Sequence, residues 1–184
     1  MPKKNDKGES GFSLIEVMIS AAIMTVGLLS LLGVFGLAMA STQQAQQDMI
    51  AKQIGNEAME GLITARDTQQ IPFDSIQNVS NGGIFLDNFQ PILQPGVDGI
   101  LGTGDDAGGA VLTEPGPDGI MGTADDVQLP LTDYQRQIQI AAVPLAGGGV
   151  SQTLRSVTIT IQYNVPQRRA VKQFVLTGFI SKYR

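Results

Sequence analysis

The chain has 184 residues, enough for one compact domain with an appendage but too few for two full-sized domains. It contains no Cys and no His, which excludes a disulfide framework, a Cys or His metal site and a His general base. Zinc hydrolases, thiol enzymes and Ser-His-Asp hydrolases are therefore excluded. The formal net charge of -5 argues against a basic surface that binds nucleic acid.

The amino-terminal quarter of the chain changes composition abruptly. Residues 1–11 are polar and contain three lysines, whereas residues 12–40 are almost wholly apolar and carry Glu16 as their one charge. As a helix, the uncharged run Val17–Ala40 would span ~36 Å, enough to cross a bilayer core of ~30 Å. The lysines that precede it would keep the amino terminus cytoplasmic. The pattern predicts a single-pass transmembrane helix.

The start of this apolar run has a specific motif. A Gly is followed by an aromatic residue and then by apolar residues, and a Glu lies five positions after the Gly. The string is Gly11-Phe-Ser-Leu-Ile-Glu16-Val-Met-Ile-Ser. A short basic leader precedes the string, and a long apolar helix continues it. This combination closely resembles the processing motif of type IV prepilins and pseudopilins.

The resemblance implies a role for three residues. A membrane-embedded aspartyl protease, the prepilin peptidase, would cleave between Gly11 and Phe12 and methylate the new amino terminus at Phe12. Glu16 would pair with the amino terminus of a neighbouring subunit during assembly. Elementary electrostatics agrees, because a carboxylate in an apolar span costs ~2.5–3.5 kcal/mol on insertion scales. Such a group needs a cation, and residues 12–40 contain none.

The helix is expected to continue beyond the apolar run, from Phe12 to Arg66. No Pro occurs between Phe12 and Ile71, and Pro72 is the expected stop. Residues at spacings of four, four, four and three form an apolar stripe: Ile50, Ile54, Ala58, Leu62 and Ala65. Three glycines in the apolar half favour either bending on assembly or close helix packing: Gly27, Gly33 and Gly36.

Two acidic segments twenty residues apart are near copies of each other. Residues 95–106 and 115–126 are identical at nine of twelve aligned positions, and 95–126 holds seven acidic residues without a Lys or Arg. Clustered carboxylates with Gly turns suit Ca²⁺, and the candidate ligands are Asp98, Asp105, Asp106, Asp118, Asp125 and Asp126. The segments loosely resemble thrombospondin type 3 repeats but lack their alternating Asp pattern. The alternative is a solvated acidic loop.

The same carboxylates do not predict an enzyme. They lie in a repeated Gly/Pro turn context, whereas a catalytic acid needs a buried and shaped cleft. The phosphate-binding strings GxGxxG and GxxxxGK[ST] and the nucleophile string GxSxG do not occur in the chain. We therefore expect no catalytic residues.

The carboxy-terminal part predicts an antiparallel sheet. Three stretches combine period-2 alternation with β-branched residues: 134–143, 155–163 and 170–180. This meander would be covered by the stripe Ile50–Ala65. The one basic cluster, Arg168, Arg169 and Lys172, lies beside the second turn, where three charges are more typical of a solvated strand edge than of a DNA-binding surface.

Together these features predict an α+β, pilin-like fold, in which a long helix packs on a meander of three to four strands. The expected parts are a leader at 1–11, a membrane or filament-core helix at 12–40, its amphipathic continuation at 41–67, and a globular domain at 68–184 with acidic repeat loops.

The expected function is that of a type IV pilus subunit, more specifically a minor pilin in filament assembly or adhesion. The alternatives are a minor pseudopilin of a type II secretion system and a calcium-dependent adhesin on a pilin-type anchor. The expected partners are other pilins, the prepilin peptidase, the assembly platform and the inner membrane. No cofactor is expected to be required, and Ca²⁺ is the candidate ion for the acidic loops. The globular domain would lie in the periplasm and then on the pilus or pseudopilus.

Overall fold

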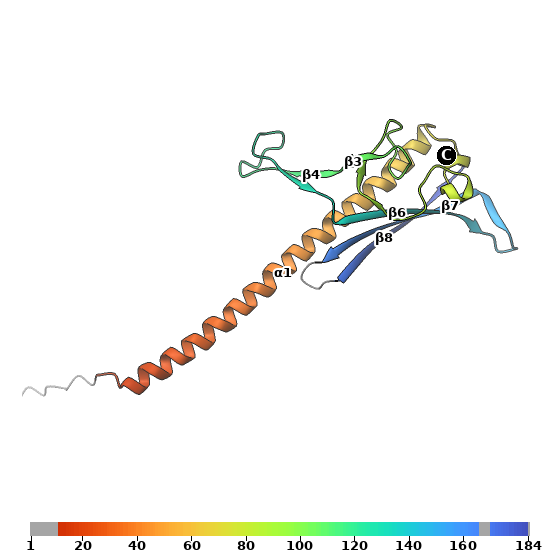
Figure 1. Cartoon of the computed structure of the whole chain (residues 1–184). Coiled ribbons are helices and arrows are strands. Elements are labelled where there is room, and N and C mark those ends of the chain that lie inside the picture. The colour runs from red at the N-terminus through yellow and green to blue at the C-terminus, as the bar shows by residue number, and fades with distance from the viewer. Residues whose placement is uncertain (1–10, 166–169, 184) are drawn as a thin grey trace, which may run out of the picture. The chain divides into compact units, whose positions relative to one another are not determined.

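A computed structural model of the chain describes residues 11–165 and 170–183. The chain divides into two units, Met1–Gln44 and Ala45–Arg184, and helix α1, Leu14–Asp67, contributes to both (Figure 1). The expected helix 12–66 is thus confirmed to within two residues. The chain is helical along this length because no Pro interrupts it, and Gly27, Gly33 and Gly36 do not break it.

The carboxyl end of α1 differs from the expectation. The helix ends five residues before Pro72, through a Schellman motif in which Gln69 has a φ of 61°. The Gln69 N–H donates to Arg66 O at 3.1 Å, and the Gln70 N–H donates to Ala65 O at 2.9 Å. Pro72 is the extended residue that precedes the short 3-10 helix η1, Phe73–Ser75. The prediction that Pro72 ends the helix was therefore wrong, because the Schellman hydrogen bonds end it five residues earlier.

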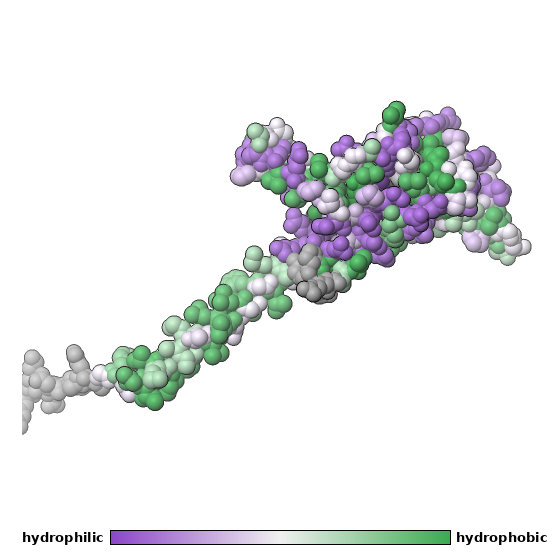
Figure 2. All heavy atoms as spheres, viewed as in Figure 1, coloured by the Kyte–Doolittle hydropathy of each residue, from purple (hydrophilic) through white to green (hydrophobic). Residues whose placement is uncertain are grey.

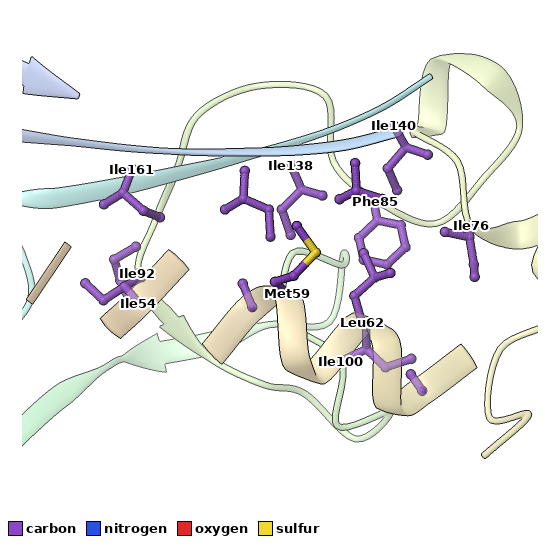
Figure 3. Packing of buried hydrophobic residues seen from close by; sticks show 14 of the residues in the cluster. Ile54, Met59, Leu62, Ile76, Phe85, Ile92, Ile100, Ile138, Ile140 and Ile161 are labelled. Atoms are coloured by element: carbon purple, nitrogen blue, oxygen red, sulfur yellow. The ribbon is translucent and has the colours of Figure 1, made fainter. Parts of the chain in front are cut away.

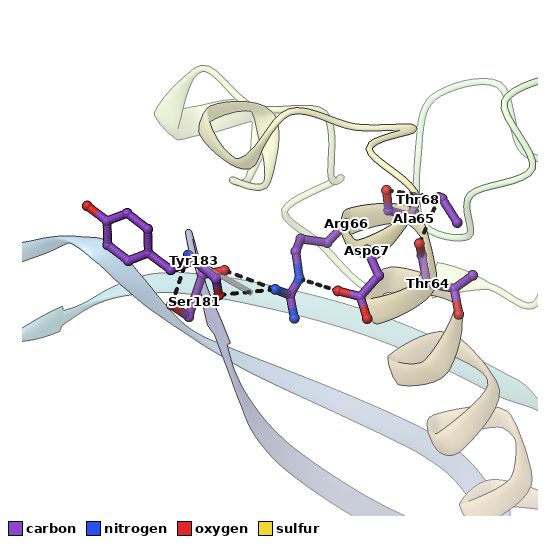
Figure 4. Close-up of polar contacts among 7 residues, drawn as sticks. All are labelled: Thr64, Ala65, Arg66, Asp67, Thr68, Ser181 and Tyr183. Atoms are coloured by element: carbon purple, nitrogen blue, oxygen red, sulfur yellow. Dashed lines mark hydrogen bonds and ion pairs between the residues drawn. The ribbon is translucent and has the colours of Figure 1, made fainter.

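The Arg66 side chain ties this helix end to the end of the sheet (Figure 4). Its Nη1 donates to Ser181 O at 3.4 Å and to Tyr183 O at 3.5 Å, while its Nε lies 2.9 Å from the Asp67 carboxylate. A cation in the last turn also suits the negative end of the helix dipole.

The main sheet of the second unit has four antiparallel strands in the order β1-β6-β7-β8. Their bounds are Gln90–Pro91, Tyr134–Pro144, Val150–Val165 and Ala170–Ser181. The three long strands are consecutive and form the expected meander, so this prediction is confirmed. Its central register places Ile138 opposite Ile159 and Ile159 opposite Leu176, which directs one apolar row to the same face.

That face packs on the part of α1 that belongs to the same unit (Figure 3). The buried helix residues recur every three or four positions: Ala51, Ile54, Gly55, Ala58, Met59, Leu62 and Ala65. Gly55 permits close approach, since a Cβ there would lie 2.9 Å from Cε1 of Phe174. The expected stripe is confirmed, with Ile50 only half-buried at its start.

One edge of the sheet is closed by a side chain that sequence analysis did not single out. Asn78 is 6% exposed and lies beside β6. Its Nδ2 donates to Ile138 O at 2.7 Å, and its Oδ1 accepts from the Ile140 N–H at 2.7 Å. The amide therefore replaces a strand partner where β1 has ended. The short 3-10 helix η2, Val79–Asn81, follows it directly.

Each acidic repeat forms the loop of a small antiparallel hairpin. Residues 95–106 join β2, Leu93–Gln94, to β3, Ala107–Gly109. Residues 115–126 join β4, Val111–Glu114, to β5, Val127–Pro130. We call these the first and second repeat hairpins. They were expected as loops, and the strands that close them are additional.

Candidate functional site

The amino-terminal motif begins in extended chain and continues into helix. Gly11, Phe12 and Ser13 precede α1, and the Phe12 side chain is 83% exposed. A Cβ at Gly11 would meet no described atom within 4 Å. The peptide bond between Gly11 and Phe12 is thus accessible in the described structure, as a protease substrate must be. The leader residues 1–10 lie outside the described residues.

Glu16 occupies the first turn of α1. Its N–H donates to Ser13 O at 3.0 Å, and the Val17 N–H donates to the same oxygen at 3.2 Å. A carboxylate here is stabilised by the positive end of the helix dipole. The spacing Ser-x-x-Glu is also that of a capping box, a local signal that sequence analysis missed. Among the described residues Glu16 forms no ion pair, so its charge is available to a partner.

Hydrophobic side chains cover the apolar segment on the face seen in Figure 2. Each large hydrophobic residue from Phe12 to Met39 is more than half exposed, and the helix is long and apolar enough to cross a membrane. Two of its hydroxyls bond within the helix: Thr25 donates to Ala21 O at 2.7 Å and Ser30 to Val26 O at 2.8 Å. These two hydroxyls therefore need no partner from outside the helix.

The first repeat uses its carboxylates to hold its own turn. Asp98 Oδ1 accepts from the Ile100 N–H at 2.8 Å. Asp105 accepts from the Thr103 hydroxyl at 2.7 Å and from the Asp98 N–H at 3.2 Å. Asp106 Oδ2 accepts from the Gly102 N–H at 2.7 Å.

The second repeat reproduces this pattern bond for bond. Asp118 accepts from the Ile120 N–H at 2.8 Å, and Asp125 accepts from the Thr123 hydroxyl at 2.6 Å. The remaining two bonds are Asp118 N–H to Asp125 at 3.3 Å and Gly122 N–H to Asp126 at 2.7 Å. Nine identical residues thus specify one turn twice.

These contacts set the carboxyl pKa values. The Thr103 hydroxyl and the Asp98 N–H lower the pKa of Asp105, and the equivalent donors lower that of Asp125. Burial raises the pKa of Asp106, although the backbone N–H of Gly102 and the Arg136 guanidinium, 3.6 Å away, oppose this shift.

The six Asp residues are brought together as two sets of three, yet neither set converges on one point. Among the described residues no group of three or more acidic side chains is placed to hold a metal ion. The feature that best suits a cation is the Oδ1 atom of Asp106 and of Asp126, each buried with no hydrogen-bond partner among the described residues. Calcium binding therefore stays a prediction.

The basic cluster is only partly described. Arg168 and Arg169 lie outside the described residues. Lys172 faces helix α1, where its Nζ lies 2.6 Å from Asp48 Oδ2, and the Tyr163 hydroxyl donates to Asp48 Oδ1 at 2.6 Å. These donors lower the pKa of Asp48. Lys172 thus fastens the sheet to the helix, which was not foreseen.

Comparison with known proteins gives one match. A family model for the prokaryotic N-terminal methylation motif matches residues 6–32. No curated protein and no solved structure matches the chain. The motif, the long apolar helix and the antiparallel sheet agree with one another, and together they support a type IV pilin-like prepilin that carries the N-terminal methylation motif.

Proposed function

We propose that this protein is a structural subunit of a type IV pilus, made as a membrane-anchored precursor. The observation that carries the proposal is the methylation motif at residues 6–32, together with the exposed apolar helix that begins within it at Leu14. Such a helix is stable only in lipid or among other apolar helices. A protein of this kind assembles and does not catalyse a reaction.

Processing would occur at the accessible bond between Gly11 and Phe12. The prepilin peptidase would remove the leader on the cytoplasmic side and methylate Phe12. The subunit would then wait in the inner membrane as a single-pass protein, with its globular unit in the periplasm. Assembly would transfer the helix from lipid into a bundle of like helices on the assembly platform, exchanging one apolar environment for another.

Glu16 would direct this transfer. Its carboxylate is the one charge between Phe12 and Ala40, and no described cation pairs with it. Within a bundle of apolar helices an unpaired carboxylate is strongly unfavourable, whereas a neighbour's amino terminus would supply a cation. Correct axial register would therefore be the arrangement in which Glu16 finds its partner.

Within this class we propose a minor pilin of assembly or adhesion. The support is the second repeat hairpin, whose exposed tip would have to be accommodated at every position of a uniform fibre. A minor pseudopilin of a type II secretion system is the alternative. Genes for a retraction ATPase beside this one would favour the pilus, and a secretin-linked secretion operon would favour the pseudopilin.

The test is the intact mass and amino-terminal sequence of the protein from membranes of cells that contain the peptidase. We expect a chain that starts at Phe12 and carries one additional methyl group. Gly11→Val should leave the precursor uncut, while Gly8→Val in the same leader should not prevent cleavage. An uncut wild-type chain, or a mature-sized band from Gly11→Val, would overturn the processing proposal.

A further inference from the structure

The turns of the two repeat hairpins have matching glycine conformations. Gly99 in the first turn and Gly119 in the second have φ values of 68° and 69°. Gly102 and Gly122, the next equivalent pair, have φ values of 89° and 88°. Both turns also share the hydrogen bonds described above. The turns are therefore two copies of one module, and differences in their surroundings do not arise from differences in the turns.

The first copy shows what the module packs against. Ile100 is 4% exposed, and Gly102 O accepts from the Leu86 N–H at 2.9 Å. A Cβ at Gly102 would lie 2.7 Å from Ile138 Cδ1, so the turn lies directly on the apolar face of the sheet. Asp106 reaches Arg136, whose side chain is 3% exposed. The module thus docks an apolar residue and a carboxylate on an apolar surface that contains a guanidinium.

The second copy presents the same face to solvent. Ile120 is 60% exposed and Met121 is 57% exposed. A Cβ at Gly122 would meet no described atom within 4 Å. In Figure 1 the loop between β4 and β5 extends away from the rest of its unit. Burial of these two apolar side chains would be favourable, so the tip is a candidate docking surface.

The same chain contains a groove of matching chemistry next to the first repeat. Its volume is about 350 Å³, and it is lined mainly by apolar side chains from α1, β2 and β4, together with Leu101 of the first repeat. Arg136, the partner of Asp106, also lines it. Glu57 on the groove wall partly offsets the charge of Arg136, so apolar contact would supply most of the affinity.

We propose that the second repeat hairpin of one subunit docks in this groove of a second copy of the chain, with Ile120 and Met121 in the groove. The inference rests on the proposed function in one respect, because a filament or membrane pool places copies side by side. Tip and groove are different surfaces, so the contact is head-to-tail and propagates. Copies of this subunit would thus occupy adjacent positions in the filament, even where the subunit is present in few copies.

The cysteine-free chain allows a direct test by disulfide cross-linking in membranes. A tagged full-length chain carrying Met121→Cys is produced with an untagged chain carrying Leu93→Cys in the groove. After mild oxidation, non-reducing gels should show a linked heterodimer. The matched control is Val150→Cys, which is 48% exposed at the start of β7. We expect roughly tenfold more heterodimer with Leu93→Cys, the ratio that 1.4 kcal/mol produces.

Three results would overturn the proposal: equal linkage to both sites, no linkage, or linkage only between two Met121→Cys chains, which would mean that the tips meet each other. Adding Ile120→Ser to the tagged chain should abolish the heterodimer. The amino-terminal mass of the same membrane protein reports separately on processing, so failure of the docking contact and failure of the pilin pathway are distinguishable.

Discussion

The first and second repeat hairpins present one turn in two environments. Their hydrogen bonds and glycine conformations agree closely, yet Ile100 is buried in the core and Ile120 is exposed at a tip. The turn is therefore held by its own Asp and Thr side chains and does not require the core. Burial is an additional property, which the first copy has because the sheet and helix lie beside it.

The contrast shows how a short module serves two purposes. In the first copy its apolar residue completes the core of the globular unit, where Ile100 belongs to the same buried cluster as Ile138 and Leu62. In the second copy the same residue type is free for a contact outside the chain. Each of the following four predictions compares matched positions in the two copies, beginning with the largest effect.

The largest difference is expected for Ile100→Ala against Ile120→Ala. Removing the buried side chain should lower the free energy of unfolding by about 3 kcal/mol, because transfer energy is lost and a cavity remains. The exposed side chain should cost less than about 0.5 kcal/mol. Denaturant unfolding of both variants measures the difference. Equal losses would mean that the second tip is already buried.

A smaller difference is expected for Gly102→Ala against Gly122→Ala. Both residues have a φ near 88°, so an alanine costs about 1–2 kcal/mol at either position. At Gly102 the new Cβ also approaches Ile138 Cδ1 to 2.7 Å, which should add about 1 kcal/mol as the methyl shifts. Thermal unfolding of both variants tests this prediction, and a larger loss at Gly122 would contradict the assigned packing.

The contribution of a carboxylate to the pH dependence of stability should follow its surroundings, so the equivalent Asp105 and Asp125 should behave alike and Asp106 should differ from both. The pKa values of Asp105 and Asp125 are lowered, so their stabilisation is present above the unfolded value of about 3.9 and is lost as pH falls through the folded values. Asp106 has a raised pKa, so its ionisation on the basic side of 3.9 reduces stability.

Carbon-detected NMR titration of the carboxyl groups provides the measurement. Thr103→Val and Thr123→Val should raise the pKa of Asp105 and of Asp125 respectively, by similar amounts, because the hydroxyl is the first cause of each shift. A shift in one copy alone would show that the two turns are not equivalent in solution.

The smallest effect concerns calcium. We expect weak binding, of the order of 10⁻³ M, since the carboxylates already bond within each turn. The second repeat should bind more tightly, because Arg136 lies 3.6 Å from Asp106 in the first. In a calorimetric titration with Ca²⁺, the heat of binding should therefore fall more in the Asp125→Asn variant than in the Asp105→Asn variant. A larger loss with Asp105→Asn would contradict this order.

Much of the fold could be predicted because its signals are local. The absence of Pro over the 60 residues 12–71 and the period of the stripe predicted α1, and alternating β-branched residues predicted β6, β7 and β8. The methylation motif was predicted from consecutive residues and is matched over 6–32. The position of the helix end was predicted to within one residue, but its Schellman motif was missed because Gln69, a residue without the usual turn preference, adopts the left-handed conformation.

Long-range contacts could not be predicted in the same way. Asn78 closes the edge of β6 across 60 positions, and Lys172 pairs with Asp48 across 124. Neither spacing has a sequence signature, because such contacts depend on how the sheet is placed on the helix. One of the three residues of the basic cluster, Lys172, is consequently paired with a carboxylate of helix α1.

The sequence by itself determined the apolar anchor, the motif around Gly11 and Glu16, the strands of the meander and the internal structure of both repeats. All of these depend on neighbouring residues or on a short period. Only the tertiary structure decided that the first repeat is buried and the second exposed. Two nearly identical segments have nearly the same local energies. Which of them is buried therefore depends on which one lies beside the helix and the sheet in the folded chain.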